Sequence, residues 1–176
     1  MFKRGAVTSA FLPVLLGGCG VWQAASDGTA NAWHVMTDWR VKVVDVDMSA
    51  HADLNPDASG HPGSVAVRVY QLKDRKRFDS ASFNDLIRRD QTLLAPDLQT
   101  SMATVVNPGA SASVSQPMQK ETAFIAIAAF YETPNKAGAW KQVIAARKLP
   151  DDVPLKLTLA DGKLELANED TKAGKR

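Results

Sequence analysis

The sequence is poor in the residues on which disulfide-stabilised domains and many enzyme sites depend. Its 176 residues include one cysteine, Cys19, so no disulfide can form within the chain. Three histidines are present, and neither G-x-S-x-G nor H-E-x-x-H occurs, so two common hydrolase motifs are absent. Basic residues outnumber acidic ones by only 21 to 19, which gives no basic excess for binding nucleic acid. With 45% hydrophobic residues, we expect a globular domain held together by its apolar core.

The most apolar stretch near the N-terminus is too short to span a membrane. Lys3 and Arg4 precede an uncharged, largely apolar segment, residues 5–18, which is the layout of a secretory signal peptide. The segment ends in Leu16-Gly17-Gly18-Cys19, which resembles a lipobox. This predicts cleavage before Cys19 and a thioether-linked diacylglycerol on its thiol. The alternative is an ordinary secretory signal followed by an incidental cysteine.

Processing would change both the charge and the destination of the chain. Loss of Lys3 and Arg4 leaves equal numbers of basic and acidic residues. Gly20 stands where an aspartate favours inner-membrane retention in enterobacterial lipoproteins, so that sorting rule implies the outer membrane. We therefore expect four segments, which are a signal peptide (1–18), a lipidated N-terminus with a flexible tether (19–37), a β-sandwich domain (38–167) and a polar tail (168–176).

Short alternating apolar runs predict an all-β sandwich of seven to eight strands. The apolar phase of the first run shifts after Val43, which indicates a bulge or a strand that passes between sheets. The fifth run is apolar on both faces and is typical of a central strand. Asp161-Gly162 joins the last two runs as a hairpin turn. The expected strands are Trp39–Met48, Val65–Leu72, Leu98–Val106, Ala112–Ser115, Thr122–Tyr131, Trp140–Ile144, Leu155–Leu159 and Leu164–Leu166.

One inserted α-helix is predicted between the second and third strands. Phe83, Leu86, Ile87 and Leu94 recur at helical spacing, and Asp79 or Ser80 could cap the N-terminus. The charged residues 73–77 before it are interpreted as a turn.

Two groups of residues give only weak indications of a catalytic or metal-binding site. Asp45 and Asp47 share one face of the first strand, but the opposite face is apolar, so a solvent-facing pair is the favoured interpretation. His51 and His61 could hold a metal with Asp53 or Asp57, although their spacing matches no known metal motif. We predict no metal site. The loop Ala50–Ser64, rich in Pro, Gly and Asn, is long for a strand connection, and such loops are often functional.

This loop and the strand after it resemble the TssJ family, also called SciN, the outer-membrane lipoproteins of type VI secretion systems. The resemblance covers about residues 38–160, and the lipobox agrees with it independently. It rests on Leu54-Asn55-Pro56-Asp57, Gly60-His61-Pro62, Val65–Lys73, Phe78, Phe83, Leu86, Thr92-Leu93, Asp97-Leu98, Phe124, Ala128–Tyr131 and Trp140-Lys141.

The resemblance implies a transthyretin-like β-sandwich with an added helix and no catalytic activity. It implies no cofactor beyond the covalent lipid, and a domain that faces the periplasm. The implied partner is the C-terminal periplasmic region of TssM, in a complex that also contains TssL. A small-ligand carrier of transthyretin-like fold is the alternative. The residues carried over as partner-binding are Leu54, Asn55, Pro56, Asp57, Gly60 and Pro62, although Asn55-Pro56 could serve turn geometry alone.

Overall fold

The structure is a computed structural model that describes residues 43–134, 139–149 and 153–167. These residues all belong to one compact unit of the chain. The predicted signal peptide, the lipobox with Cys19, the tether and the polar tail lie outside the described residues. No helix in the described ranges is long and apolar enough to cross a membrane.

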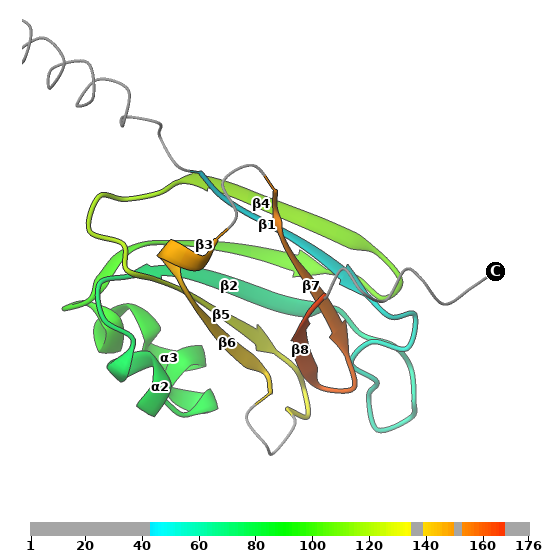
Figure 1. The fold of residues 1–176 in the computed structure, drawn as a ribbon. Coiled ribbons are helices and arrows are strands. Elements are labelled where there is room, and N and C mark those ends of the chain that lie inside the picture. The colour runs from blue at the N-terminus through cyan, green and yellow to red at the C-terminus, as the bar shows by residue number, and fades with distance from the viewer. Residues whose placement is uncertain (1–42, 135–138, 150–152, 168–176) are drawn as a thin grey trace, which may run out of the picture. The chain divides into compact units, whose positions relative to one another are not determined.

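Eight strands form two four-stranded sheets packed face to face, which confirms the predicted β-sandwich (Figure 1). Sheet A has the strand order β4-β1-β7-β8, and sheet B has the order β3-β2-β5-β6. The bounds in sheet A are Ser111–Pro117 (β4), Val43–Ala50 (β1), Leu155–Ala160 (β7) and Lys163–Leu166 (β8). Those in sheet B are Leu98–Val106 (β3), Val65–Leu72 (β2), Phe124–Phe130 (β5) and Lys141–Ala145 (β6).

The period-2 pattern of β1 decides which face of sheet A is buried. Val44, Val46 and Met48 point into the core, while the residues between them face outward. Asp45 is exposed, and the Asp47 carboxylate accepts a hydrogen bond from the Ser113 hydroxyl at 2.6 Å. The pair is therefore solvent-facing, as interpreted. The phase shift expected after Val43 lies at the boundary of the described residues, because residues 39–42 are outside them.

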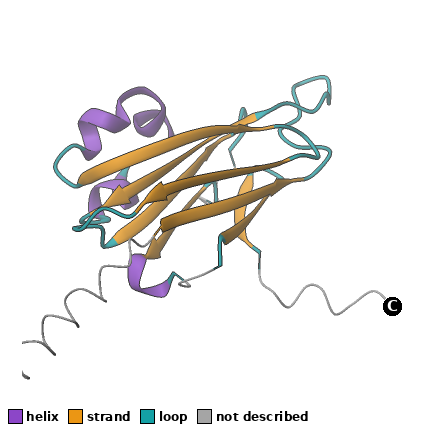
Figure 2. Cartoon of the chain, turned by 90° about the horizontal axis from the view of Figure 1, so that it is seen from above, coloured by secondary structure: helices purple, strands orange, loops and turns teal. Residues whose placement is uncertain are grey.

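Sheet B is covered on both faces, which explains the uniformly apolar β5. Val65, Val67 and Val69 of β2 face sheet A. The other face of sheet B lies beneath two helices, α2 (Lys76–Ser80) and α3 (Phe83–Leu94) (Figure 1). Fully buried Ala126 and Ala128 of β5 alternate with the core-facing residues, and such small side chains allow helices to approach a sheet closely. Seen from above, the helices lie outside the stacked strands (Figure 2).

The helical layer differs from the prediction in three ways. A short helix, α2, begins at Lys76, within the residues 73–77 that were expected to form a turn. The cap of α3 is Ser82, whose hydroxyl accepts from the Asp85 amide in a capping box, so the expected cap at Asp79 or Ser80 is wrong. Ile87 is 42% exposed, so its assignment to the apolar face is also wrong. The reason is that the inward face runs through Leu86, Asp90 and Leu94.

Asp90 is a buried aspartate on the inward face of α3, at a position where an apolar residue would be expected. The Asp90 carboxylate accepts from the Tyr70 hydroxyl at 2.9 Å and pairs with the Arg68 guanidinium at 2.9 Å. Arg68 also donates to the carbonyl oxygen of Leu86 at 3.0 Å. Since buried polar groups are stable only when they are paired, this cluster fixes the position of α3 on sheet B.

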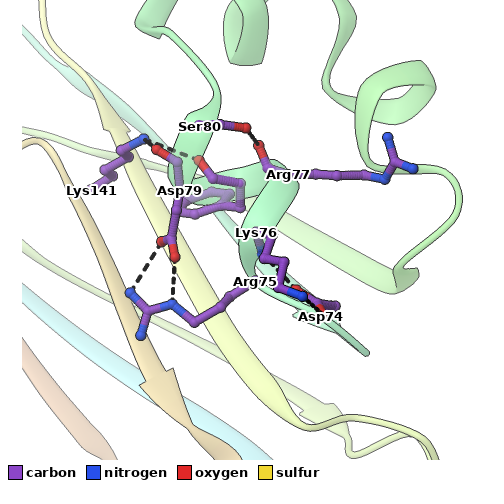
Figure 3. A network of polar contacts seen from close by, with 8 residues as sticks. Asp74, Arg75, Lys76, Arg77, Asp79, Ser80 and Lys141 are labelled. Carbon is purple, nitrogen blue, oxygen red and sulfur yellow. Dashed lines mark hydrogen bonds and ion pairs between the residues drawn. The ribbon is translucent and has the colours of Figure 1, made fainter.

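Lys141 at the start of β6 holds the end of α2 in place (Figure 3). Its ammonium donates to the carbonyl oxygens of Phe78, Asp79 and Ala81 at 3.0, 2.8 and 2.9 Å. Carbonyls at a helix C-terminus lack intrahelical partners, so one lysine satisfies three of them. Desolvation lowers the pKa of Lys141, and the Asp79 charge partly opposes this effect.

Several strand boundaries differ from expectation by one or two residues, and those of β4 and β6 are the most informative. β4 extends to Pro117, beyond the expected end at Ser115, because an edge strand tolerates a proline that cannot donate to a ladder. β6 begins at Lys141, after Trp140. Trp140 is a buried core aromatic, and its ring meets that of Phe83 edge-on, with the ring centroids 5.0 Å apart. A 3-10 turn, η1 (Ala146–Lys148), follows β6.

Candidate partner-binding end of the sandwich

Four strand connections meet at one end of the sandwich because the strands run back and forth between the same two ends. We call this the loop end. Val43, the first described residue of β1, lies at the opposite end, about 25 Å away along eight residues of strand. The described residues of the loop end are 51–64 (β1–β2), 107–110 (β3–β4), 131–134 and 139–140 (β5–β6) and 161–162 (β7–β8).

Asp57 organises the exposed tip of the β1–β2 connection. Its carboxylate accepts from the amides of Ser59 and His61 at 2.8 and 2.9 Å, and its own amide donates to the carbonyl oxygen of His61 at 3.0 Å. The backbone hydrogen bond from His61 is the main cause that lowers the pKa of Asp57. The carboxylate is thus ionised and its position is fixed.

Asn55 braces the connection from inside. Its φ of 49° lies in the left-handed region that asparagine tolerates. Its side-chain amide donates to the carbonyl oxygen of Ser64 at 3.1 Å and accepts from the Glu132 amide at 2.7 Å. A side chain at Gly63 would place its Cβ 3.0 Å from the Asn55 carbonyl oxygen, so any other residue would push this backbone aside by a few tenths of an ångström. These two residues therefore shape the loop.

The six carried-over residues fall into three groups. Leu54 is fully buried and belongs to the core, so its side chain is not presented to a partner. Asn55 is half-buried and braces the loop. The remaining four, Pro56, Asp57, Gly60 and Pro62, are exposed at the surface of the connection. Contact with a partner stays a prediction for these residues.

Three of the connections are hydrogen-bonded to one another or to strand residues that flank the β7–β8 turn. The His51 amide donates to the carbonyl oxygen of Leu159 at 3.1 Å, and the His51 carbonyl accepts from the Gly109 amide at 2.9 Å. The Ser64 hydroxyl donates to the side-chain oxygen of Asn107 at 2.7 Å. The Tyr131 hydroxyl donates to the Lys163 carbonyl oxygen. Such cross-bracing fixes a surface before binding and lowers the entropy that binding costs.

A hollow of about 240 Å³ opens between three of these connections. A second hollow, of about 280 Å³, lies over β4, β1 and β7. Pockets for small molecules usually measure about 300–1,000 Å³, so neither favours the small-ligand carrier. The first is lined by Asp53, Asn55, Pro56, Tyr131, Thr133, Asp161 and Gly162.

The histidines of the loop do not gather metal ligands. His61 Nδ1 lies 3.4 Å from an Asp57 carboxylate oxygen, and both side chains are exposed. No group of three histidine, cysteine or acidic side chains within ranges 43–134, 139–149 and 153–167 could hold an ion.

Sequence reasoning missed Tyr131, Thr133 and Asp161 as part of this end. Asp161-Gly162 was recognised as a turn, with φ of 50° and 69° in the structure, but nothing local shows which other connection it faces.

This architecture places the chain in the class of eight-stranded β-sandwich domains with helices added to one sheet. Residues 42–162 match the family model described as type VI secretion lipoprotein, VasD, EvfM, TssJ, VC_A0113. The chain therefore belongs to the type VI secretion lipoprotein family, as its sequence motifs predicted. No curated protein matches it.

Solved structures agree with the family and the fold. A chain in a structure described as the type VI membrane complex has 32% identity and a TM-score of 0.69, over 73% of this chain and 100% of that one. A chain in a structure of the "T6SS protein TssM C-terminal domain (869-1107) from EAEC" has 31% identity and a TM-score of 0.64, over 73% and 99%. The lipoprotein TssJ1 from Pseudomonas aeruginosa has the same fold, at 23% identity and a TM-score of 0.62, over 72% and 95%.

Proposed function

We propose that this protein is the outer-membrane lipoprotein that anchors the trans-envelope complex of a type VI secretion system. In this role it binds the periplasmic C-terminal region of TssM, within a complex that also contains TssL. The observation that carries the proposal is the 31% identity to a chain in the structure of the TssM C-terminal domain, together with the family match. The role is mechanical, and we propose neither catalysis nor any cofactor beyond the lipid on Cys19.

The geometry of the domain supports a link with two separate ends. Residues 20–42 join the proposed lipid on Cys19 to the start of β1. The braced loop end lies at the far end of the same strand. A β-sheet resists extension along its strands, so a domain attached at one end and bound at the other can transmit force between a membrane and a partner.

Replacing the proposed lipid attachment site tests the anchor. Cys19→Ser should leave the midpoint of thermal unfolding unchanged, since Cys19 precedes the family domain, residues 42–162. The variant should move from the membrane fraction to the soluble periplasmic fraction, and effector release should stop. Secretion at the normal rate by this variant would rule out the anchoring role. A Ser49→Ala variant, which changes an exposed residue of β1, serves as the control and should secrete normally.

A further inference from the structure

We propose that this chain associates with a second copy of itself through the edge of sheet B, where β3 of one copy pairs antiparallel with β3 of the other. This inference goes beyond the function proposed above and does not depend on it. Three features of β3 support the pairing: an open hydrogen-bonding edge, a complete lack of charge, and exposed apolar side chains.

The outer edge of β3 has no partner strand among the described residues. β3 pairs with β2 alone, from Val65↔Val106 to Leu72↔Leu98. Within ranges 43–134, 139–149 and 153–167, no other backbone group forms a hydrogen bond with residues 99–106. Alternate amide and carbonyl groups of β3 therefore point away from the sheet, and such a row can pair with a further strand.

The other three edge strands carry features that discourage pairing. Natural edge strands are blunted by charged side chains, by proline or by shortness. β8 has four residues, among them Lys163 and Glu165, and β6 has five residues, among them Lys141. β4 ends at Pro117. β3, by contrast, has nine residues and contains no charged residue, proline or glycine, so it is the least protected of the four edges.

The absence of charge extends over the whole side of the sandwich to which β3 belongs. Residues 98–119, which include both β3 and β4, contain no charged side chain. Since 23% of the chain is charged, about five charged residues would be expected in a stretch of this length. β3 and β4 lie against each other, because the Gln116 side-chain amide donates to the Thr100 hydroxyl at 2.9 Å. Two copies that meet through these strands therefore bring no like charges together and desolvate no charged group of either strand.

Apolar side chains are exposed beside the open edge. Of the large apolar side chains that the structure describes, Val105 is the most exposed, at 58%. Ala103 of β3 and Ala66, which lies opposite Val105 on β2, are exposed on the same face of the sheet. A strand that pairs antiparallel with its own copy obeys two-fold symmetry, so these residues would meet the same residues of the second copy and be shielded from water.

The size of the contact indicates a weak dimer. Residues 99–106 extend over about 26 Å, and a sandwich of two sheets is about 20 Å thick. Edge-to-edge contact would bury about 500 Å² on each copy, or about 1,000 Å² in total, which is near the lower limit for a specific interface. The proposed lipid would hold both copies in one membrane and raise their effective concentration, so a weak contact is sufficient.

Sedimentation of the purified chain tests the dimer without any partner. Residues 19–176 with Cys19→Ser would be studied from about 1 μM to about 1 mM, and the average mass should rise from one copy toward two. Val105→Lys or Ala103→Lys should weaken dimerisation about tenfold or more, with the thermal midpoint unchanged. Leu166→Lys, at a 43% exposed residue of the opposite edge strand β8, is the matched control and should dimerise normally. A monomer at every concentration, or dimers that survive both β3 substitutions, would overturn the proposal.

Disulfide formation tests the antiparallel geometry. Two-fold pairing places one residue of β3 opposite its own copy, with the Cβ atoms about 4.5–5.5 Å apart. Single cysteines placed in turn at residues 101–105 of the Cys19→Ser chain should therefore give most disulfide-linked dimer at one position and less on both sides. Leu166→Cys should give none. Equal yields at all positions, or none, would contradict the pairing of β3 with itself.

The same variants separate this inference from the proposed function. If the chain stays monomeric and Val105→Lys lowers its affinity for TssM, the edge pairs with a strand of TssM and the second-copy proposal fails. If the chain dimerises through β3 but does not bind the periplasmic C-terminal region of TssM, the proposed function fails and the dimer stands.

Discussion

At the scale of single residues, the members of the motif in the β1–β2 connection have different roles. Some stabilise the loop, and others are exposed to solvent. Leu54 fills the core, Asn55 adopts a positive φ, and only the residues after them face the solvent. The sequence identified the motif correctly but could not separate these roles. A leucine between polar neighbours can be buried beneath a loop or exposed on it, and the local sequence does not distinguish the two cases.

Leu54 gives a direct test of this division. Leu54→Ala should lower the free energy of unfolding by about 2–5 kcal/mol, because it removes a fully buried side chain from a packed core. Leu166→Ala is the control, since Leu166 is 43% exposed, and should cost less than about 1 kcal/mol. Urea unfolding of the two variants provides the measurement. Equal losses in both would show that Leu54 is not part of the core.

At the scale of elements, the strands and the inserted helix α3 were predictable, but the short helix α2 and the exact inward face of α3 were not. Alternation along β1 and β2 reports which side chains are buried, so strand positions follow from the sequence. The helices pack through a buried Asp90 and leave Ile87 exposed, which inverts the apolar pattern at those positions. Only the tertiary partners Arg68 and Tyr70 explain why an aspartate is tolerated there.

The observed cap of α3 leads to a prediction at this scale. Ser82→Ala removes the hydroxyl that accepts from the Asp85 amide and should lower the free energy of unfolding by about 1 kcal/mol. A loss of that size should lower the melting temperature by about 2–5 °C. Ser80→Ala removes only an exposed hydrogen bond to the Arg77 carbonyl and should have a smaller effect. A larger loss in Ser80→Ala than in Ser82→Ala would place the cap where the sequence suggested it.

At the scale of the whole molecule, the proposed membrane attachment and the proposed partner-binding surface lie at opposite ends of the strands. Val43, the first described residue, lies at one end of β1, and the cross-braced connections lie at the other end. The fold and the family could be predicted from strand patterns and from the motif. The shared hollow could not, because Asp53, Tyr131 and Asp161 are far apart in sequence and meet only through the sheet topology.

Site-specific photo-crosslinking in living cells tests the central claim most directly. A photoreactive amino acid at Pro56 or Pro62, both exposed at the loop end, should crosslink this protein to TssM. The same amino acid at Ser115, which is exposed on the outer face of β4, should give no such product. Crosslinks to TssM from Ser115, with none from Pro56 or Pro62, would contradict the account and move the interface to sheet A.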